Sequence, residues 1–290
     1  MQKVDFNDQI SRNNWKSFFL IFSIFIIFIA LGYLISFAFA PGYFFLIMII
    51  SIIFSLTYIW LTYYNSGRIA VASVGAKPAS HEKYKLYHDL VESLSIASGI
   101  PKPKLYVMES RQINAFASGR NPENAVICVT TGALEKLDKE ELRGVLAHEL
   151  GHVANYDIKY MTVATIMVGM IAIISEMFLH SLWFNGNGDN KNVFLIIVGV
   201  LLAILAPIVV NLIQLAISRR REYNADASAV KFTRYPRGLI GALKKIEREN
   251  VFPEKKVSKA VAPLFFSNPL KNLTSTHPSI EKRIKALEKM

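Results

Sequence analysis

The sequence predicts an α+β protein that is mainly helical and crosses a membrane more than once. Hydrophobic residues make up 52% of the 290 residues although 19% are charged, and long stretches contain no charged side chain at all. Such averages arise when apolar segments of spanning length alternate with ordinary polar sequence. Short β-rich runs between predicted helices add the strands of the α+β class.

The first uncharged segment covers residues 17–67. A bilayer core needs about 20 apolar residues per helix, so this segment is long enough for two spans. Pro41-Gly42 divides it where a turn between antiparallel helices would lie. We therefore predict transmembrane helices over residues 18–39 and 43–63, within an N-terminal membrane hairpin at 1–67. A cleaved signal peptide is the alternative for the first span, but a second span follows it at once.

A second membrane pair is predicted within residues 160–217, with spans at about 160–184 and 193–217. The alternative is that these segments are hydrophobic but buried in protein. Glu176 lies in the third span, where an acid is costly and suggests function. Pairing with His180, four residues on, is the simpler explanation.

Charge asymmetry orients the four spans. The short connections 40–42 and 185–192 carry only one positive charge between them. Basic residues gather instead on the other flanks, namely Lys3, Arg12, Lys16, Arg68, Lys77, Lys83, Lys85, Arg219, Arg220 and Arg221. The positive-inside rule therefore predicts that both termini and the 68–159 segment lie in the cytoplasm.

The polar sequence falls into two parts, 68–159 and 218–290. Apolar periodicity, caps and β-rich runs predict helices at 80–98, 138–155, 217–230, 239–248 and 279–288, with strands at 104–108 and 125–130. Asp138 followed by Glu141 has the form of a capping box and would begin the second of these helices. Pro236-Arg237-Gly238 would interrupt the chain between the third and fourth.

The helix that Asp138 begins carries the sequence His148-Glu149-Leu150-Gly151-His152. Histidines four residues apart project from one face of a helix and can both bind a single tetrahedral zinc ion. Glu149 would then reach a metal-bound water and not the metal itself. The alternative is a helix with two incidental histidines.

A catalytic zinc needs a third protein ligand and one open position. Glu222 is the candidate, because Asp226 lies four residues further along the same predicted helix and could orient a ligand histidine through a hydrogen bond. The alternative for Glu222 is a surface ion pair with Arg219. Taken with the two histidines, the spacing favours ligation of one Zn²⁺ per chain.

Four motifs together resemble those of the HtpX-type membrane metalloproteases, relatives of the CAAX prenyl endopeptidases. They are His148-Glu149-Leu150-Gly151-His152, Arg221-Glu222-Tyr223-Asn224-Ala225-Asp226, Asn114-Ala115-Phe116-Ala117 and Ser275-Thr276-His277-Pro278. The resemblance covers nearly the whole chain and implies a zincin-like metalloprotease domain. It also implies a multi-pass protein of the bacterial plasma (inner) membrane that degrades damaged or misassembled membrane proteins, or unfolded polypeptides.

The same resemblance implies two further roles in the site. Asn114, Ala115 and Phe116 would lie beside the bound peptide, although an ordinary turn is the alternative for this segment. His277 would stabilise the oxyanion or bind substrate, although it could equally begin a helix ahead of Pro278. Glu149 would take a proton from the zinc-bound water and pass it to the leaving amine.

Three alternatives are weighed against a zinc endopeptidase. A non-catalytic membrane scaffold with structural zinc would need a closed four-ligand site, often with cysteine, and Cys128 is the only cysteine. A CAAX-type prenyl endopeptidase is the nearest enzymatic competitor. Nucleic-acid binding is suggested only by the net charge of +11, which the flanks of membrane spans explain. The sequence gives no oligomeric state.

Overall fold

The computed structural model describes residues 15, 18–19, 21–23, 25–27, 29–30, 32–33, 41–159, 162, 219–249, 265–267 and 278–290. The chain separates into two compact units. We call them the polar unit, which contains residues 65–162 and 216–290 together with 1–14, and the apolar unit, which contains residues 15–64 and 163–215. Each is described by itself.

In the apolar unit, a short 3-10 helix η1 (Pro41–Tyr43) leads into α2 (Phe44–Tyr64). Of the helices in the described part of the chain, α2 alone is long and apolar enough to cross a membrane. Its large side chains, among them Phe45, Ile53 and Trp60, are exposed. Outward-facing apolar side chains on an uncharged helix are stable in lipid and costly in water.

The second predicted span is thus confirmed as an apolar helix, displaced by one residue. The described positions between 15 and 33 are also helical, in line with the first span. The third and fourth predicted spans, with Glu176 and His180, lie outside the described residues. The multi-pass arrangement therefore stays a prediction.

The polar unit contains a four-stranded sheet in the order β1-β2-β4-β3. Its strands are β1 (Lys77–Pro78), β2 (Lys104–Met108), β3 (Ala115–Ser118) and β4 (Val126–Thr130). β2 and β4 are parallel, whereas β1 and β3 are antiparallel to their neighbours. The two predicted strands are confirmed, and β3 is an additional strand where sequence alone favoured a turn.

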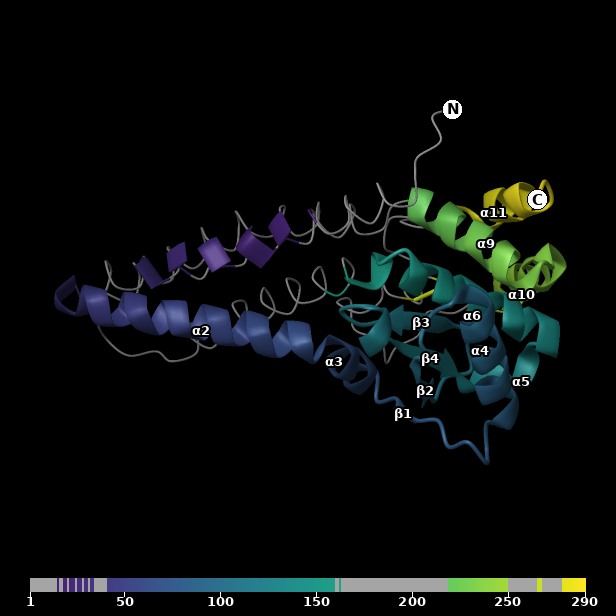
Figure 1. Ribbon diagram of the computed structural model, residues 1–290, viewed down its shortest axis with the longest axis horizontal. Helices are drawn as coiled ribbons and strands as arrows, with labels where there is room; N and C mark the ends of the chain where they lie inside the picture. Colours follow the sequence, from purple (N-terminus) through teal and green to yellow (C-terminus); the bar gives the residue numbers. More distant parts are fainter. Residues whose placement is uncertain are drawn as a thin grey trace. The chain divides into compact units, whose positions relative to one another are not determined.

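The helices described in the polar unit are α3 (Ser66–Ser73), α4 (Lys85–Ser98), α5 (Thr131–Lys136), α6 (Lys139–Ala154), α9 (Arg219–Thr233), α10 (Pro236–Glu249) and α11 (Ile280–Leu287), with a 3-10 turn η2 (Pro122–Asn124). Some of these helices pack on the sheet, and α9, α10 and α11 pack on other helices (Figure 1). Two boundaries correct the sequence prediction. The helix expected from residue 80 begins at Lys85, after a turn. Pro236 does not interrupt the chain but opens α10, because proline at a first helical position loses no hydrogen bond.

Both faces of β4 are covered. Ile127 and Val129 join the main core with α4 and α6, whereas Val126 and Cys128 pack in a second cluster with Phe116 and residues of α3. Alternate residues of a strand point to opposite faces, so five consecutive buried residues mark a strand covered on both sides. The sheet is therefore a rigid support for what lies along its β3 edge.

Helix α6 is the centre of the polar unit and packs against β3, α4, α9 and α10 (Figure 1). Its start is fixed as the sequence predicted. Asp138 accepts hydrogen bonds from the backbone of Glu140 and Glu141, and the Glu141 carboxylate accepts one from the Asp138 backbone, each at 2.9 Å. Lys245 of α10 adds an ion pair to Glu141 at 2.6 Å. This capping box holds the helix that carries both histidines.

Candidate metal centre and active site

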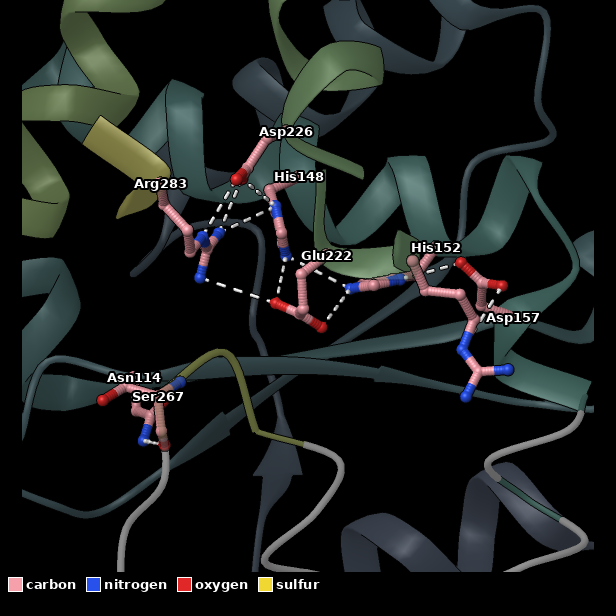
Figure 2. Close-up of polar contacts among 9 residues, drawn as sticks. Asn114, His148, His152, Asp157, Glu222, Asp226, Ser267 and Arg283 are labelled. Carbon is pink, nitrogen blue, oxygen red and sulfur yellow. Dashed lines mark hydrogen bonds and ion pairs between the residues drawn. The ribbon is translucent and has the colours of Figure 1, made fainter. Parts of the chain in front are cut away.

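Three side chains from two helices converge in the interior of the polar unit (Figure 2). Nε2 of His148 and Nε2 of His152, one turn apart on α6, are 3.1 Å apart. Glu222 in the first turn of α9 places its two carboxylate oxygens 3.7 Å and 3.6 Å from these nitrogens. In the described part of the chain, these residues form the one group of three metal-binding side chains, with ligand atoms all within 4.8 Å.

Close packing of α9 on α6 makes this convergence feasible. A Cβ built at Gly151, between the two histidines, would lie 3.0 Å from the backbone oxygen of Ala225. That distance is shorter than nine in ten real Cβ contacts. Glycine at this position therefore lets the backbone of α9 approach α6 closely enough for Glu222 to reach the histidines.

His148 is oriented by a carboxylate that is itself anchored. Asp226, one turn beyond Glu222 on α9, lies 2.9 Å from His148 Nδ1. Arg283 of α11 donates two hydrogen bonds to this carboxylate, at 2.6 Å and 2.9 Å, and lies 3.5 Å from Glu222. Asp226 therefore lies within hydrogen-bond distance of His148, where a carboxylate that orients this histidine would need to lie. An imidazole that donates from Nδ1 presents the lone pair of Nε2 to a metal.

His152 has an orienting carboxylate as well. Asp157 accepts a hydrogen bond from His152 Nδ1 at 3.1 Å and is fully buried. Arg221, the residue before Glu222, lies 3.9 Å from the other oxygen of Asp157. Both histidines therefore direct Nε2 toward the same point.

The electrostatics of the two histidines differ. Burial and the nearby charge of Arg283 lower the pKa of His148 to about 4, despite its hydrogen bond to Asp226. Burial also acts to lower the pKa of His152, but the Asp157 hydrogen bond and the charges of Glu222, Asp157 and Glu149 outweigh it and raise that pKa to about 9. In the metal-free site a proton therefore resides on His152. A cation that binds between the histidines would displace this proton.

Glu149 lies on α6 between the two histidines and is almost fully buried. Burial raises the pKa of its carboxyl to about 7, with Glu222 adding to the effect and His152 opposing it. The backbone N–H of Ala117, on β3, hydrogen-bonds the carboxylate. Its Oε1 atom has no hydrogen-bond partner among the described residues. A buried oxygen of this kind, with a pKa near neutrality, suits a group that exchanges protons with a bound water.

The segment expected to lie beside the substrate runs along the β3 edge. Asn114 is buried and makes two hydrogen bonds with the backbone of Ser267, at 2.8 Å and 3.0 Å (Figure 2). Ala115 accepts a hydrogen bond from the Phe266 backbone at 2.8 Å, and Phe116 forms an antiparallel bridge with Phe265. Residues 265–267 therefore lie against this edge, and the Phe266 ring stands edge-on to His148 at 4.8 Å. His277 lies outside the described residues.

The site fits a catalytic metal ion. Two imidazole nitrogens and one carboxylate are the ligands that a catalytic zinc ion uses when it keeps one position open. The partnerless oxygen of Glu149 lies in the same buried region, as the proposed base would require. A closed structural site with cysteine would require Cys128 as a ligand. Cys128 instead lies in the second core cluster and is not a member of the three-residue group.

Sequence reasoning missed three charged residues of the site. Arg283 belongs to an amphipathic helix on which an arginine is expected at the surface, yet it is 2% exposed. Asp157 follows His152 by five residues, a spacing that does not place two side chains on the same face of a helix. Arg221 was counted among the basic residues that flank a membrane span. Each owes its role to a contact that local periodicity does not encode.

The fold and the site together define a metalloprotease of the class that holds its metal by two histidines of one helix and a glutamate of another. The sequence profile of the family described as Peptidase family M48 matches residues 82–290. The chain therefore belongs to peptidase family M48, and it is a membrane-anchored metalloprotease.

Individual relatives agree with this assignment. The chain is 45% identical to a Protease HtpX homolog of Caldanaerobacter subterraneus, over 87% of this chain and 90% of the relative. It is 41% identical to a Protease HtpX homolog of Thermoanaerobacter pseudethanolicus, over 97% of this chain and 96% of the relative. The expected resemblance to HtpX-type proteases is thus confirmed.

A solved structure shares the fold. The crystal structure of Ste24p from S. mikatae matches 96% of this chain with a TM-score of 0.53 at 21% identity. This chain spans 66% of the length of that protein. At this level of identity the likeness concerns the fold alone.

Proposed function

We propose that this protein is a zinc endopeptidase in which His148, His152 and Glu222 bind the metal and Glu149 is the general base. The observation that carries the proposal is the buried triangle of ligand atoms within 4.8 Å, next to a buried Glu149 oxygen that has no partner among the described residues. Two imidazoles and a carboxylate favour zinc over the harder cations magnesium and calcium, which prefer oxygen ligands.

The metal, when bound, would act as a Lewis acid and lower the pKa of a water molecule. Glu149 would accept a proton from a water held beside its carboxylate and return it, since burial raises its pKa to about 7 in the metal-free site. The Ala117 N–H holds the carboxylate in place, and the leaving peptide nitrogen receives the proton.

Asn114, Ala115 and Phe116 are proposed to position the substrate. They lie on the β3 edge, and the next residue, Ala117, touches Glu149. Residues 265–267 cover part of this edge, and an extended peptide would pair with the strand beside them or in their place. A peptide bound there would place its backbone beside the general base. For His277 we keep the role of oxyanion or substrate contact, which rests on the sequence resemblance.

The natural substrates are proposed to be damaged membrane proteins and unfolded polypeptides, cleaved on the cytoplasmic side of the bacterial inner membrane by a multi-pass protein. The apolar α2 helix and the basic residues flanking the predicted spans support this location. The relatives named Protease HtpX homolog favour this activity over a CAAX-type prenyl endopeptidase.

The test compares the wild-type protein with Glu149→Gln, purified in detergent. The ligands stay intact in this variant, so we expect one zinc per chain in both proteins by metal analysis. Cleavage of casein should fall by at least about 100-fold, because general-base catalysis contributes factors of that order. A prenylated CAAX peptide serves as a second substrate.

Chelator treatment followed by zinc provides the control, because it should abolish and then restore wild-type cleavage. Full activity of Glu149→Gln would remove the proposed base. Bound zinc with no hydrolysis of any substrate would favour the scaffold alternative. Cleavage of the prenylated peptide alone would favour the CAAX-type enzyme.

A further inference from the structure

The two histidine ligands are supported in unequal ways. The carboxylate beside His148 belongs to Asp226 and is held by two strong hydrogen bonds from Arg283. The position of Asp226 follows from the Glu–x–x–x–Asp spacing on one helix. The carboxylate behind His152 is Asp157, which belongs to no recognised motif of the sequence. What holds Asp157, and whether it acts on the metal, is therefore a separate question.

The backbone after α6 turns Asp157 back toward the site. The helix ends at Ala154, and Tyr156 has a φ of 57°, in the left-handed region that a non-glycine residue rarely adopts. This turn brings Asp157 to 3.1 Å from His152 Nδ1, with the carboxylate entirely buried. Both the unfavourable backbone conformation and the burial of a charge cost free energy, so contacts of the folded site must offset them.

Arg221 supplies one such contact from the other half of the polar unit. Its side chain is 5% exposed and its Nε lies 3.9 Å from Asp157 Oδ1. Because Arg221 directly precedes Glu222, the same turn of α9 contributes the third ligand and the partner of Asp157. The turn after α6 and the start of α9 are thereby joined next to the metal-binding triangle (Figure 2).

We propose that Asp157, held by Arg221, is a second positioning residue of the metal centre, which fixes the orientation of His152 and strengthens binding of the metal. This inference rests on the proposed metal site. Asp157 does not touch the metal or the substrate. It acts through His152 by keeping the proton on Nδ1 and the lone pair of Nε2 directed at the metal.

The decisive variant is Asp157→Asn. An asparagine has the same shape, but its amide lacks the negative charge, and if it presents its NH₂ group to His152 the histidine takes the tautomer that cannot bind through Nε2. We expect the dissociation constant for zinc, measured by chelator competition in detergent, to rise by roughly 10–100-fold. The exposed Asp89 on α4 provides a matched control, since Asp89→Asn removes the same charge and should leave the constant unchanged.

A second measurement separates positioning from a structural role. Residues 157–159 are helical, so Asp157 also lies at a helix start and contributes to the fold as well as to the site. The melting temperature of the metal-free Asp157→Asn protein measures that structural contribution and is the baseline for this variant, as the metal-free wild type is for its own. The rise in melting temperature on adding a fixed zinc concentration should be smaller in the variant, because that rise depends on affinity.

Arg221→Lys tests the other partner and leaves Asp157 in place. We expect weaker zinc binding in this variant. Combining it with Asp157→Asn should weaken binding no further than Asp157→Asn alone, because both changes act through the hydrogen bond between Asp157 and His152. If Asp157→Asn does not fold, zinc affinity of Arg221→Lys carries the test. An unchanged constant in that protein would overturn the proposal.

Two other results would also overturn it. One is a dissociation constant of Asp157→Asn within about twofold of the Asp89→Asn control, a difference well below the effect expected for an orienting carboxylate. The other is a fall in metal-free melting temperature with unchanged affinity, which would make Asp157 a structural residue only. Failure of the wild type itself to bind zinc would instead contradict the proposed function, so the two failures are distinguishable.

Discussion

At the level of single residues, the site gives two chemically identical side chains different pKa values. His148 and His152 are one turn apart on α6, yet the pKa of the first is lowered to about 4 and that of the second raised to about 9. The difference follows from Arg283, whose positive charge faces His148, and from the carboxylates around His152. Local charge therefore decides which ligand must lose a proton before metal binds.

This difference predicts the pH dependence of metal binding. Between about pH 7 and 9 the metal-free site holds a proton on His152 and none on His148, and binding of a cation must release it. Zinc affinity should therefore rise by about tenfold per pH unit over this interval and level off above it, whereas a histidine of ordinary pKa would level off near pH 7. Chelator competition across this range measures the slope. Constant affinity from pH 7 to 9 would contradict the assigned charge of His152.

At the level of elements, the contact between α6 and α9 determines where Glu222, the proposed third ligand, lies. The two helices come from distant parts of the chain, and no side chain separates their backbones at Gly151. The spacing of His148 and His152 follows from one helix, but the distance to Glu222 follows from how closely two helices pack.

Gly151→Ala should therefore lower zinc affinity by about tenfold, an order typical of displaced supporting groups. Alanine is the better helix former, so α6 itself is not weakened. The added carbon would press on Ala225 and Ser228 of α9 and shift Glu222. Gly67→Ala in α3 is the matched control, because its added carbon meets the Val126 side chain at the same 3.0 Å and does not touch α9. Equal zinc affinity in both variants would show that the close approach at Gly151 does not position Glu222.

At the level of the whole molecule, the three proposed metal ligands belong to two stretches of polar sequence that enclose the second predicted membrane pair. Both stretches fall in the polar unit, and residues 163–215 fall in the apolar unit. If the four predicted spans cross the bilayer, both stretches emerge on the same side, as the charge asymmetry requires.

Cysteine labelling tests this topology. The native Cys128 is buried, and burial raises the pKa of its thiol, so it should react little with a maleimide. Ile96→Cys, at a position of α4 that is 79% exposed, should be labelled by an impermeant maleimide only after the cells are opened. Asn187→Cys, in the connection predicted to be outside, should be labelled in intact cells. Labelling of Ile96→Cys in intact cells would place the polar unit outside.

Much of this protein follows from local sequence. The capping box at Asp138 and Glu141 and the apolar α2 helix were predicted from spacing and composition, because caps and hydrophobic runs act over a few residues. The same holds for the helical pairs His148–His152 and Glu222–Asp226, since residues four apart share a face wherever the helix packs.

Tertiary structure alone decided the rest. Whether the two pairs meet depends on the packing of α6 against α9, which the spacing within either helix does not contain. Arg283 reaches Asp226, the partner of His148, from α11. Asp157 reaches His152 from a turn with a left-handed residue. Neither contact joins residues at a helical or strand spacing along the chain. The metal-binding pattern was thus determined by sequence, whereas the charges that orient each ligand were determined by elements that the chain brings together only on folding.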